Sequence, residues 1–441
     1  MCKLKAMSKR KPQKKKIQSF VEDDIYILEI GARGDGIAEY KNEKLFIPRA
    51  IQNEKVKVKI RPRKSGGYSG ELLGIKEKST QRIEPPCPYY EKCGGCSLQH
   101  ISKDAYRKWK VAKVKDMLSR ADAMPTEWHE TIFIPPETRR RATFAAFMHK
   151  GNVIVGYYQS RTHQIIDIEN CLVLTPRLND IARQLRPYLK EILPENRPVS
   201  LSLQEVGGQV EVILTGRFGR GGELDYPARQ ALADAAQDIG IARIGWRFKD
   251  FSEIEPVFQK GNLIKRSDGL VVTLPYNAFL QPSQEGEEAL TKCLTSIMET
   301  SKPQKIIELF AGNGTFTGPL LKYGSVQAFE NERQAVERLQ ATGMDGLTVE
   351  TRDLFEEPLL AAELQKCDCV VLDPPRAGAK DQCEELARSK VPLIVYISCN
   401  PATFARDAKA LAEGGYTLKS LQIVDQFIWS SHLEIVSVFT N

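Results

Sequence analysis

The chain has 441 residues, which is too long for one domain and is typical of about three. Its ordinary shares of hydrophobic (42%) and charged (27%) residues exclude a wholly disordered protein, and the lack of an 18-residue apolar run excludes a membrane-spanning helix. No apolar segment follows the basic start, so we expect no secretory signal and a cytoplasmic location. There the ten cysteines would stay reduced and serve metal binding or catalysis.

The net charge of +7 is unevenly distributed along the chain. Residues 1–16 contain eight Lys or Arg and no acid, whereas residues 172–441 have a net charge of −7. This asymmetry favours a front part that binds a polyanion such as nucleic acid, although a solvated basic tail without a partner would have the same charge. Because of their low complexity, we expect residues 1–17 to be a disordered basic tail.

Residues 18–82 consist of short apolar runs separated by glycine turns, which predicts a small β-barrel. Within them, residues 55–63 alternate Lys or Arg with Val, Ile or Pro, so the basic side chains share one face of a strand. That face either follows the phosphates of a nucleic acid or is the solvated outside of the barrel. The composition resembles a TRAM domain, which implies a small oligonucleotide-binding barrel.

Residues 83–274 mix strands with a helix expected at 177–189, and we predict a central RNA-binding α+β domain. Near its start, Cys87, Cys93 and Cys96 lie among prolines and paired glycines that let the backbone wrap around a metal. Cys171 is the nearest downstream candidate for a fourth ligand. Four thiolates suit a structural zinc or an iron–sulfur cluster, and the loose first spacing favours the cluster. The alternative is a set of unrelated buried cysteines.

From residue 275 onward, strands alternate with helices, which predicts an α/β fold with a parallel, doubly wound sheet. The expected strands lie at 305–309, 326–329, 347–351, 368–372 and 393–397. The last two strands, at 416–424 and 433–439, have only a loop between them. Such a closing hairpin resembles the class I methyltransferases, which implies a Rossmann-like methyltransferase domain at residues 275–441.

A glycine turn after the first of these strands predicts a nucleotide site, because glycines allow a ligand to approach the backbone closely. Glu330 ends the next strand and suits ribose hydroxyls, and Asp353 follows the third strand and could meet an adenine edge. A dinucleotide and S-adenosylmethionine both carry these groups. The glycine spacing is one residue too long for a dinucleotide, and Glu308 before the turn favours S-adenosylmethionine, whose cationic centres suit an acid-lined pocket.

Two later strands end in further motifs. The DPPRAG segment at 373–378 resembles the site of amino-methylating enzymes, but Arg376 replaces the aromatic residue that those enzymes need. Cys399 ends an apolar strand just before Pro401 opens a helix. The carboxyl end of a parallel strand is a usual place for a site, and the first turn of a helix favours a thiolate. The alternative is a small residue that merely caps the strand.

Five motifs together resemble the RNA uracil-5-methyltransferase family, and they occur in the matching order. They are FLQP at 279–282, ELFAGNG at 308–314, DPPRAG at 373–378, SCNPAT at 398–403 and HLE at 432–434. The barrel and the four front cysteines resemble the 23S ribosomal RNA (uracil-5)-methyltransferases that carry a 4Fe-4S cluster. The resemblance covers about residues 18–441.

This resemblance implies roles for the matching residues. It makes Cys399 the nucleophile and Glu434 the base. The positions of the cofactor pocket are Gln281, Phe310, Glu330, Asp353 and Asp373. The cluster ligands are Cys87, Cys93, Cys96 and Cys171. Two departures leave the target uridine open: Thr315 stands where close relatives often have Asn, and QFIW at 426–429 replaces the usual MFPH.

The chemistry of uracil explains these residue types. A thiolate that adds at carbon 6 makes carbon 5 nucleophilic toward the sulfonium methyl, and a base must then remove the carbon 5 proton before the thiolate leaves. We therefore expect an S-adenosylmethionine-dependent enzyme that methylates a uridine in RNA, with 23S ribosomal RNA favoured and transfer RNA as the alternative. A silent RNA-binding assembly protein and a radical enzyme are the competing classes. We expect a monomer with no membrane partner.

Overall fold

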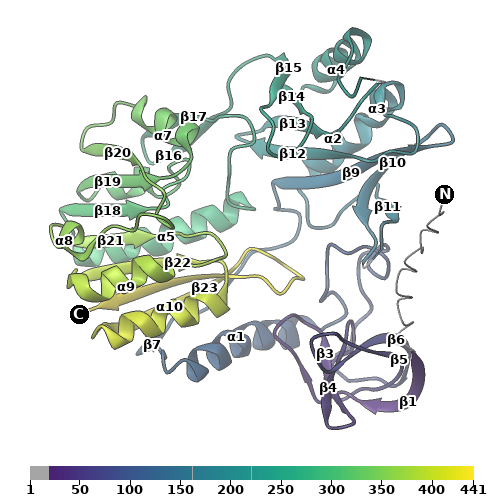
Figure 1. Ribbon diagram of the computed structural model, residues 1–441, viewed down its shortest axis with the longest axis horizontal. Coiled ribbons are helices and arrows are strands. Elements are labelled where there is room, and N and C mark those ends of the chain that lie inside the picture. The colour runs from purple at the N-terminus through teal and green to yellow at the C-terminus, as the bar shows by residue number, and fades with distance from the viewer. Residues whose placement is uncertain (1–18, 161, 220) are drawn as a thin grey trace, which may run out of the picture. The chain divides into compact units, whose positions relative to one another are not determined.

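Figure 1 shows the computed structural model, which describes residues 19–441 apart from residues 161 and 220. The tail predicted at residues 1–17 lies outside the described residues. The chain divides into two compact units, of which the second comprises Pro85–Gln99 and Tyr106–Asn441. Within the described parts of the chain, no helix combines the length and the apolar character needed to cross a lipid bilayer.

The first unit contains a six-stranded sheet in the order β1-β5-β6-β4-β3-β2. Its strands are β1 (Phe20–Tyr26), β2 (Glu29–Ile30), β3 (Gly36–Tyr40), β4 (Glu43–Ile47), β5 (Lys55–Pro62) and β6 (Tyr68–Glu77). Val56, Val58 and Ile60 of β5 are fully buried, and the basic residues between them lie on the other face, as their alternation predicts. The sheet is thus built around one small apolar core, while its similarity to a TRAM domain stays a prediction.

Three basic side chains on the outer face of β5 pair with acids of neighbouring strands. Lys55 pairs with Glu77 at 2.6 Å. Lys57 lies 3.5 Å from Asp23, and the neighbouring Arg61 lies 3.6 Å from an acid of β6. These ion pairs leave less free charge for phosphates than the sequence suggests, and they favour the solvated outer face over a phosphate-tracking one.

A seven-stranded sheet occupies the middle of the chain, in the order β11-β10-β9-β12-β13-β14-β15. Its strands are β9 (Arg141–His149), β10 (Asn152–Tyr158), β11 (Ile165–Asp167), β12 (Val199–Val206), β13 (Gln209–Thr215), β14 (Arg243–Arg247) and β15 (Glu255–Gln259). Its helices are α2 (Pro176–Gln184), α3 (Arg186–Ile192) and α4 (Tyr226–Ile239), which share one core with the sheet. The single helix expected at 177–189 is in fact two, because Pro187 opens α3 after a break at Leu185.

The C-terminal region is a nine-stranded sheet in the order β20-β19-β18-β21-β22-β24-β23-β7, with β8 also paired to β23. Its C-terminal strands are β18 (Lys305–Leu309), β19 (Ser325–Glu330), β20 (Leu347–Thr351), β21 (Cys369–Leu372), β22 (Leu393–Ser398), β23 (Thr417–Asp425) and β24 (Glu434–Thr440). A two-stranded ribbon, β16 (Ile264–Ser267) and β17 (Leu270–Thr273), precedes them. β18 to β22 are parallel, and β23 and β24 form the expected antiparallel hairpin.

Helices cover both faces of this sheet, as Figure 1 shows. Its helices are α5 (Gln284–Ser301), α6 (Thr317–Leu321), α7 (Arg333–Gln340), α8 (Ala361–Leu364), α9 (Lys380–Ser389) and α10 (Pro401–Glu413). α5, α6 and α7 share a core with Val371 and Val395, whereas α8, α9 and α10 share another with Val370 and Ile394. Neighbouring residues of one strand thus serve opposite cores, which is the doubly wound α/β arrangement that the sequence predicts.

One early segment joins this sheet. α1 (Lys103–Arg120) contributes Val114 and Leu118 to the C-terminal core, and β7 (Glu127–Trp128) and β8 (Ile132–Phe133) pair with β23. The sequence placed these residues in the central domain. Two-residue strands carry no periodicity, so their long-range pairing could not be read from the sequence.

Candidate active site

One cavity of about 580 Å³ lies at the carboxyl edge of the C-terminal sheet. It is lined by all seven residues that the sequence singled out for catalysis or cofactor binding: Gln281, Phe310, Glu330, Asp353, Asp373, Cys399 and Glu434. Their positions follow from the topology, because parallel strands β18, β19, β21 and β22 end side by side at this edge. The structure thus brings together residues from five separate motifs.

The glycine turn after β18 opens one wall of the cavity. Phe310 has a φ of 63°, and Gly312 has a φ of 55° with open space where a Cβ would lie. A ligand can therefore approach the backbone closely at Gly312. The carboxylate of Glu330 accepts hydrogen bonds from the backbone N–H of Gly312 at 2.8 Å and from those of Asn331 and Glu332. These bonds hold the carboxylate at the cavity wall.

An aromatic pair forms the neighbouring part of the wall. The rings of Phe310 and Phe355 lie 5.6 Å apart between centroids. Asp353 accepts a hydrogen bond from the backbone N–H of Phe355 at 3.0 Å and one from the side chain of Asn331 at 3.1 Å. An aromatic wall that lines the same cavity as a carboxylate suits a purine ring with an exocyclic amino group.

Two polar side chains near the turn, Asn313 and Glu308, are buried. Asn313 lines the cavity, and its Oδ1 has no hydrogen-bond partner among the described residues. An acceptor in that position fits a donor on a ligand. Glu308 is not on the cavity wall: its carboxyl is buried behind the turn, where Thr317 Oγ1 donates to it at 2.6 Å. Burial above all raises the pKa of Glu308 to about 8, so this acid is largely neutral at pH 7.

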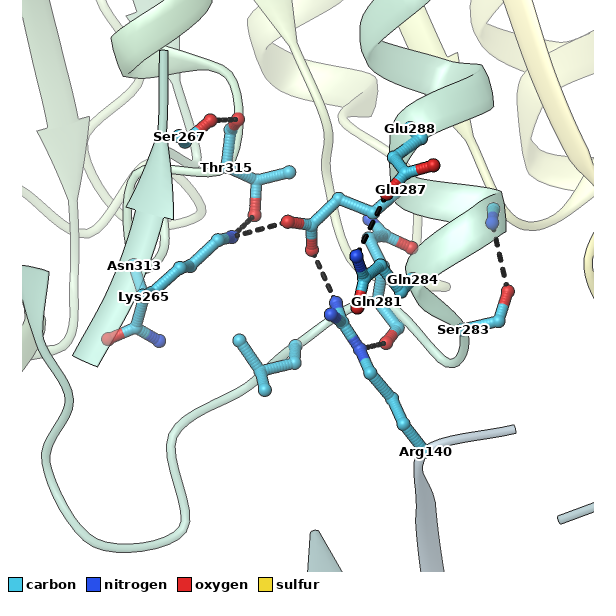
Figure 2. A network of polar contacts seen from close by, with 12 residues as sticks. Arg140, Lys265, Ser267, Gln281, Ser283, Gln284, Glu287, Glu288, Asn313 and Thr315 are labelled. Carbon is cyan, nitrogen blue, oxygen red and sulfur yellow. Dashed lines mark hydrogen bonds and ion pairs between the residues drawn. The ribbon is translucent and has the colours of Figure 1, made fainter. Parts of the chain in front are cut away.

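A polar network ties the turn to β16 and α5, as Figure 2 shows. Lys265 is buried, and its Nζ donates to Thr315 Oγ1 at 2.5 Å and pairs with Glu287 at 3.3 Å. The other oxygen of Glu287 accepts from Arg140 at 2.6 Å, and Arg140 Nε donates to the carbonyl of Gln281. The side chain of Thr315 is therefore a hydrogen-bond partner of the buried Lys265.

Cys399 follows β22 and lies half-buried two residues before α10. Burial above all, together with the carboxyls of Glu434 and Asp373, raises the pKa of its thiol to about 12. Only Arg376 among the facing side chains lowers it. The expectation that the helix start would favour a thiolate is therefore wrong for the free protein, because desolvation and two acids outweigh the helix terminus.

Glu434 begins β24, is buried and lines the same cavity as the glycine turn. Burial raises the pKa of its carboxyl well above the ordinary value, and Asp373 adds to the effect. Asp373 is half-buried at the cavity wall, and desolvation there raises its pKa to about 7. Two poorly solvated acids that face each other disfavour ionisation of both, so this end of the cavity attracts a cation.

The loop at 426–433, which leads to Glu434, is anchored at two points. Asp425, just before it, accepts from Tyr106 Oη at 2.6 Å and pairs with the fully buried Lys110 at 2.9 Å. The carbonyl of Trp429 accepts hydrogen bonds from the backbone N–H of Ser97 at 2.9 Å and of Leu98 at 3.1 Å. The cysteine-bearing segment therefore contacts the loop that leads to the base.

The four predicted metal ligands line a second cavity of about 420 Å³. They are Cys87, Cys93, Cys96 and Cys171. Phe427 and Arg376 line both this cavity and the first one, so the two share a wall. Across the described ranges, no three His, Cys, Asp or Glu side chains are gathered as the ligands of one metal ion would be.

Several residues of the site were not singled out from the sequence. Gln426 lies between Gln281 and Glu434 and donates to both. Asn313 and Phe355 line the cofactor end, and Arg139 lines both cavities. Gln426 was visible only as a departure from a familiar motif, and nothing in the pattern around Arg139 separated it from other basic residues. Their places depend on long-range packing.

The fold is that of an α/β methyltransferase. A tRNA (uracil-54, C5)-methyltransferase structure from Pyrococcus abyssi superposes with a TM-score of 0.73 at 22% identity, covering 95% of this chain and 99% of that one. A sequence profile described as tRNA (Uracil-5-)-methyltransferase matches residues 336–440.

Relatives extend the match to nearly the whole chain. An uncharacterized RNA methyltransferase of Caulobacter vibrioides is 36% identical, over 95% of this chain and 100% of the relative. The 23S rRNA (uracil(1939)-C(5))-methyltransferase RlmD of Shewanella sediminis is 29% identical, over 98% of each. The chain belongs to the RNA uracil-5-methyltransferase family.

Proposed function

We propose that this enzyme methylates carbon 5 of a uridine in 23S ribosomal RNA, in the cytoplasm and as a monomer, with S-adenosylmethionine as the methyl donor. The observation that carries the proposal is one cavity that holds a thiol, Cys399, a buried acid, Glu434, and a glycine turn with an acid-lined, aromatic pocket. The ribosomal substrate is that of the relative from Shewanella sediminis.

The residues present fit S-adenosylmethionine. Phe310 and Phe355 would hold the adenine ring, Glu330 the ribose, and the free Oδ1 of Asn313 an ammonium group. When bound, this molecule supplies an electrophilic methyl group on a cationic sulfur. Asp373 and Glu434, which are hard to ionise in the free protein, would ionise more readily beside a cation.

Cys399 acts first in the proposed mechanism. The thiol of Cys399 loses its proton to solvent water, and the thiolate adds to carbon 6 of the uracil ring, which places the electron pair of the 5,6 double bond on carbon 5 and the oxygen at carbon 4. Carbon 5 then takes the methyl group. Gln281, whose Nε2 donates to Asp373 at 3.3 Å, is placed to orient the pyrimidine. The target uridine must leave its stack to reach this buried thiol.

Glu434 completes the reaction. Its carboxylate accepts the remaining proton of carbon 5, the electron pair of that bond restores the 5,6 double bond, and the sulfur of Cys399 leaves with the pair of the carbon–sulfur bond. Burial keeps water from competing for this proton. Without the base, the methylated adduct would persist.

We further propose that Cys87, Cys93, Cys96 and Cys171 hold a 4Fe-4S cluster. A zinc ion would draw four sulfurs to within about 3.8 Å of one another, since each Zn–S bond is about 2.3 Å in a tetrahedron. A four-iron cluster takes one thiolate at each iron, so its ligands line a cavity without converging on one point. The observation behind this proposal is that all four thiols line one cavity of about 420 Å³. Its iron would stabilise the fold around this cavity.

A transfer RNA uridine is the second candidate substrate, because the matching profile is described as that of a transfer RNA enzyme. Mass mapping of ribosomal and transfer RNA from cells with and without the gene decides between the two. Loss of a 5-methyluridine from 23S RNA supports the proposal, and its loss from transfer RNA alone would replace the substrate. If neither RNA loses a 5-methyluridine, the protein has the family fold but not this activity.

The mechanism is tested with Glu434→Gln and RNA from the deletion strain. This variant should add Cys399 to the ring and transfer a labelled methyl group, but should not release the RNA. A labelled protein–RNA adduct should therefore survive denaturing electrophoresis, and Cys399→Ser should form none. A folded Glu434→Gln protein that binds RNA and cofactor without forming the adduct would exclude Glu434 as the base.

A further inference from the structure

Gln426 joins the two sides of the reaction site. Its Nε2 donates a hydrogen bond to Gln281 Oε1 at 2.8 Å and another to Glu434 Oε1 at 3.1 Å. All three side chains are at most 5% exposed. A single amide nitrogen thus links the residue placed to orient the pyrimidine with the residue placed to remove its proton.

The amide of Gln426 lies with its nitrogen toward these two acceptors and its oxygen toward α5, where Oε1 is buried and has no hydrogen-bond partner among the described residues. Its Oε1 lies at the first turn of α5, at only 2.2 Å from where a Cβ on Gly286 would be. The N-terminal end of a helix carries a partial positive charge and favours an oxygen over an N–H group. The nitrogen is directed to the two acceptor oxygens, on Gln281 and Glu434.

Gly286 is the second observation, and it is independent of the hydrogen bonds. Glycine is a poor helix former, yet it stands in the first turn of the 18-residue helix α5. A methyl group there would meet the Oε1 and the Cβ of Gln426, at 2.2 and 2.8 Å, and the Oγ of the N-cap residue Ser283, at 2.6 Å. The missing side chain of Gly286 makes the space that the amide of Gln426 occupies.

We propose that Gln426 is a positioning residue for proton removal: it holds Glu434 and Gln281 in one frame and donates a hydrogen bond to the carboxylate that takes the carbon 5 proton. This inference rests on the proposed function. With Oε1 of Glu434 engaged by Gln426, Oε2 accepts the proton. The electron pair of the carbon–hydrogen bond then forms the 5,6 double bond, and the carbon–sulfur pair returns to Cys399.

The hydrogen bond also affects the charge of the base. Burial and the facing Asp373 raise the pKa of Glu434, and the hydrogen bond from Gln426 and the charge of Arg376 lower it. Cys399 faces the same carboxyl. Loss of the Gln426 bond therefore raises the pKa of Glu434, so less carboxylate is available at neutral pH and more is recovered as the pH rises.

The test compares Gln426→Leu and Gly286→Ala with the wild type. The matched control is Gln382→Leu, which replaces a buried glutamine bonded to the backbone of Leu359, in α9 and outside the cavity. Each protein is mixed once with labelled S-adenosylmethionine and RNA from the deletion strain. The measurements are the amount of methylated adduct, the rate at which it releases RNA between pH 6 and pH 9, and the thermal midpoint.

In Gln426→Leu, adduct should form but release RNA about ten- to a hundredfold more slowly at pH 7, as expected for one lost hydrogen bond to a charged group. Release should recover toward pH 9, with its rising limb displaced to higher pH. Gly286→Ala should show the same displacement with Gln426 intact, because the new methyl group displaces the amide. Gln382→Leu should lose thermal stability and keep the wild-type release profile.

Two results would overturn the inference. One is a Gln426→Leu protein that releases RNA at the wild-type rate with the wild-type pH profile. The other is a uniform loss in which adduct formation falls as much as release at every pH, because that pattern marks general structural damage. A wild-type protein that forms no methylated uridine would instead overturn the proposed function, so the two failures are separable.

Discussion

The reactivity of Cys399 should depend on the charge of the bound ligand. Its pKa of about 12 lies three units above the ordinary value of 9.0, mainly because the thiol is buried and faces Glu434 and Asp373. At pH 7.5 the thiolate fraction is then on the order of 3 in 100,000, against about 3% for an ordinary thiol. Free protein should therefore react slowly with an alkylating reagent.

A cation in the cavity should reverse much of this effect. A unit positive charge about 5 Å from the sulfur, at an effective dielectric constant of about 20, stabilises the thiolate by about 3 kcal/mol. That energy corresponds to about two pKa units and a hundredfold more thiolate. S-adenosylhomocysteine has a neutral sulfur, whereas sinefungin carries an amine in place of the methylated sulfur and is cationic without a transferable methyl group.

The assay follows carboxamidomethylation of Cys399 by mass spectrometry of its peptide, as a function of pH and ligand. Without ligand, the rate should rise about tenfold for each pH unit up to pH 10 or above. Saturating sinefungin should accelerate the reaction relative to saturating S-adenosylhomocysteine, which has the same outline and controls for steric blocking. Cys293, buried outside the cavity, serves as the internal reference.

Two outcomes would refute this reasoning. Rapid labelling of ligand-free Cys399 at pH 7.5, at the rate of an exposed thiol, would mean that burial and the two acids do not control its ionisation. Equal rates with sinefungin and S-adenosylhomocysteine would mean that the ligand's charge does not reach the sulfur, and activation would then have to come from the RNA.

Three further predictions concern stability, metal and RNA. Lys110→Met should lower the free energy of unfolding in urea by about 3–5 kcal/mol, because it leaves the buried carboxylate of Asp425 without its ion-pair partner. Breaking the exposed Arg120–Asp116 pair should change the free energy of unfolding little, and equal effects of the two changes would contradict this prediction. Protein purified without oxygen should contain about four irons and lose them in Cys171→Ser but not in Cys293→Ser, and stoichiometric zinc instead would exclude the cluster. Deleting residues 1–16, with eight basic side chains, should reduce the slope of log affinity for RNA against log salt concentration by at most about 6. Lys55→Ala with Lys57→Ala should reduce this slope far less, because both lysines are already paired. A larger reduction in the double variant than in the deletion would mean that β5 contacts the phosphates.

The C-terminal fold was largely predictable because its signals are local. Buried parallel strands such as 305–309 appear as continuous apolar runs, and the residues that follow them must meet at one edge of the sheet. Glu330, Asp373 and Cys399 could therefore be placed together without a structure. Glu434 depended on the family resemblance, since nothing in the pattern of its own strand marks a base.

What could not be predicted depends on partners distant in sequence. The pKa of Cys399 is set by burial and by acids from β21 and β24, whereas the sequence showed only the neighbouring helix start. The ion pairs on the outer face of β5 come from flanking strands whose register the sequence left open. The place of Gln426 in the site depends on its hydrogen bond to Gln281, 145 positions earlier in the chain.

The pairing of β7 and β8 with β23 limits how this protein can be divided. β7 and β8 cover the outer side of β23, the strand that leads directly to Gln426. A fragment that begins at residue 275 would keep every catalytic residue and yet expose the bare N–H and C=O groups of that strand, which invite pairing with another chain. Residues 275–441 therefore do not form an independent domain. A protein cut at this apparent domain boundary would aggregate rather than act as a smaller enzyme.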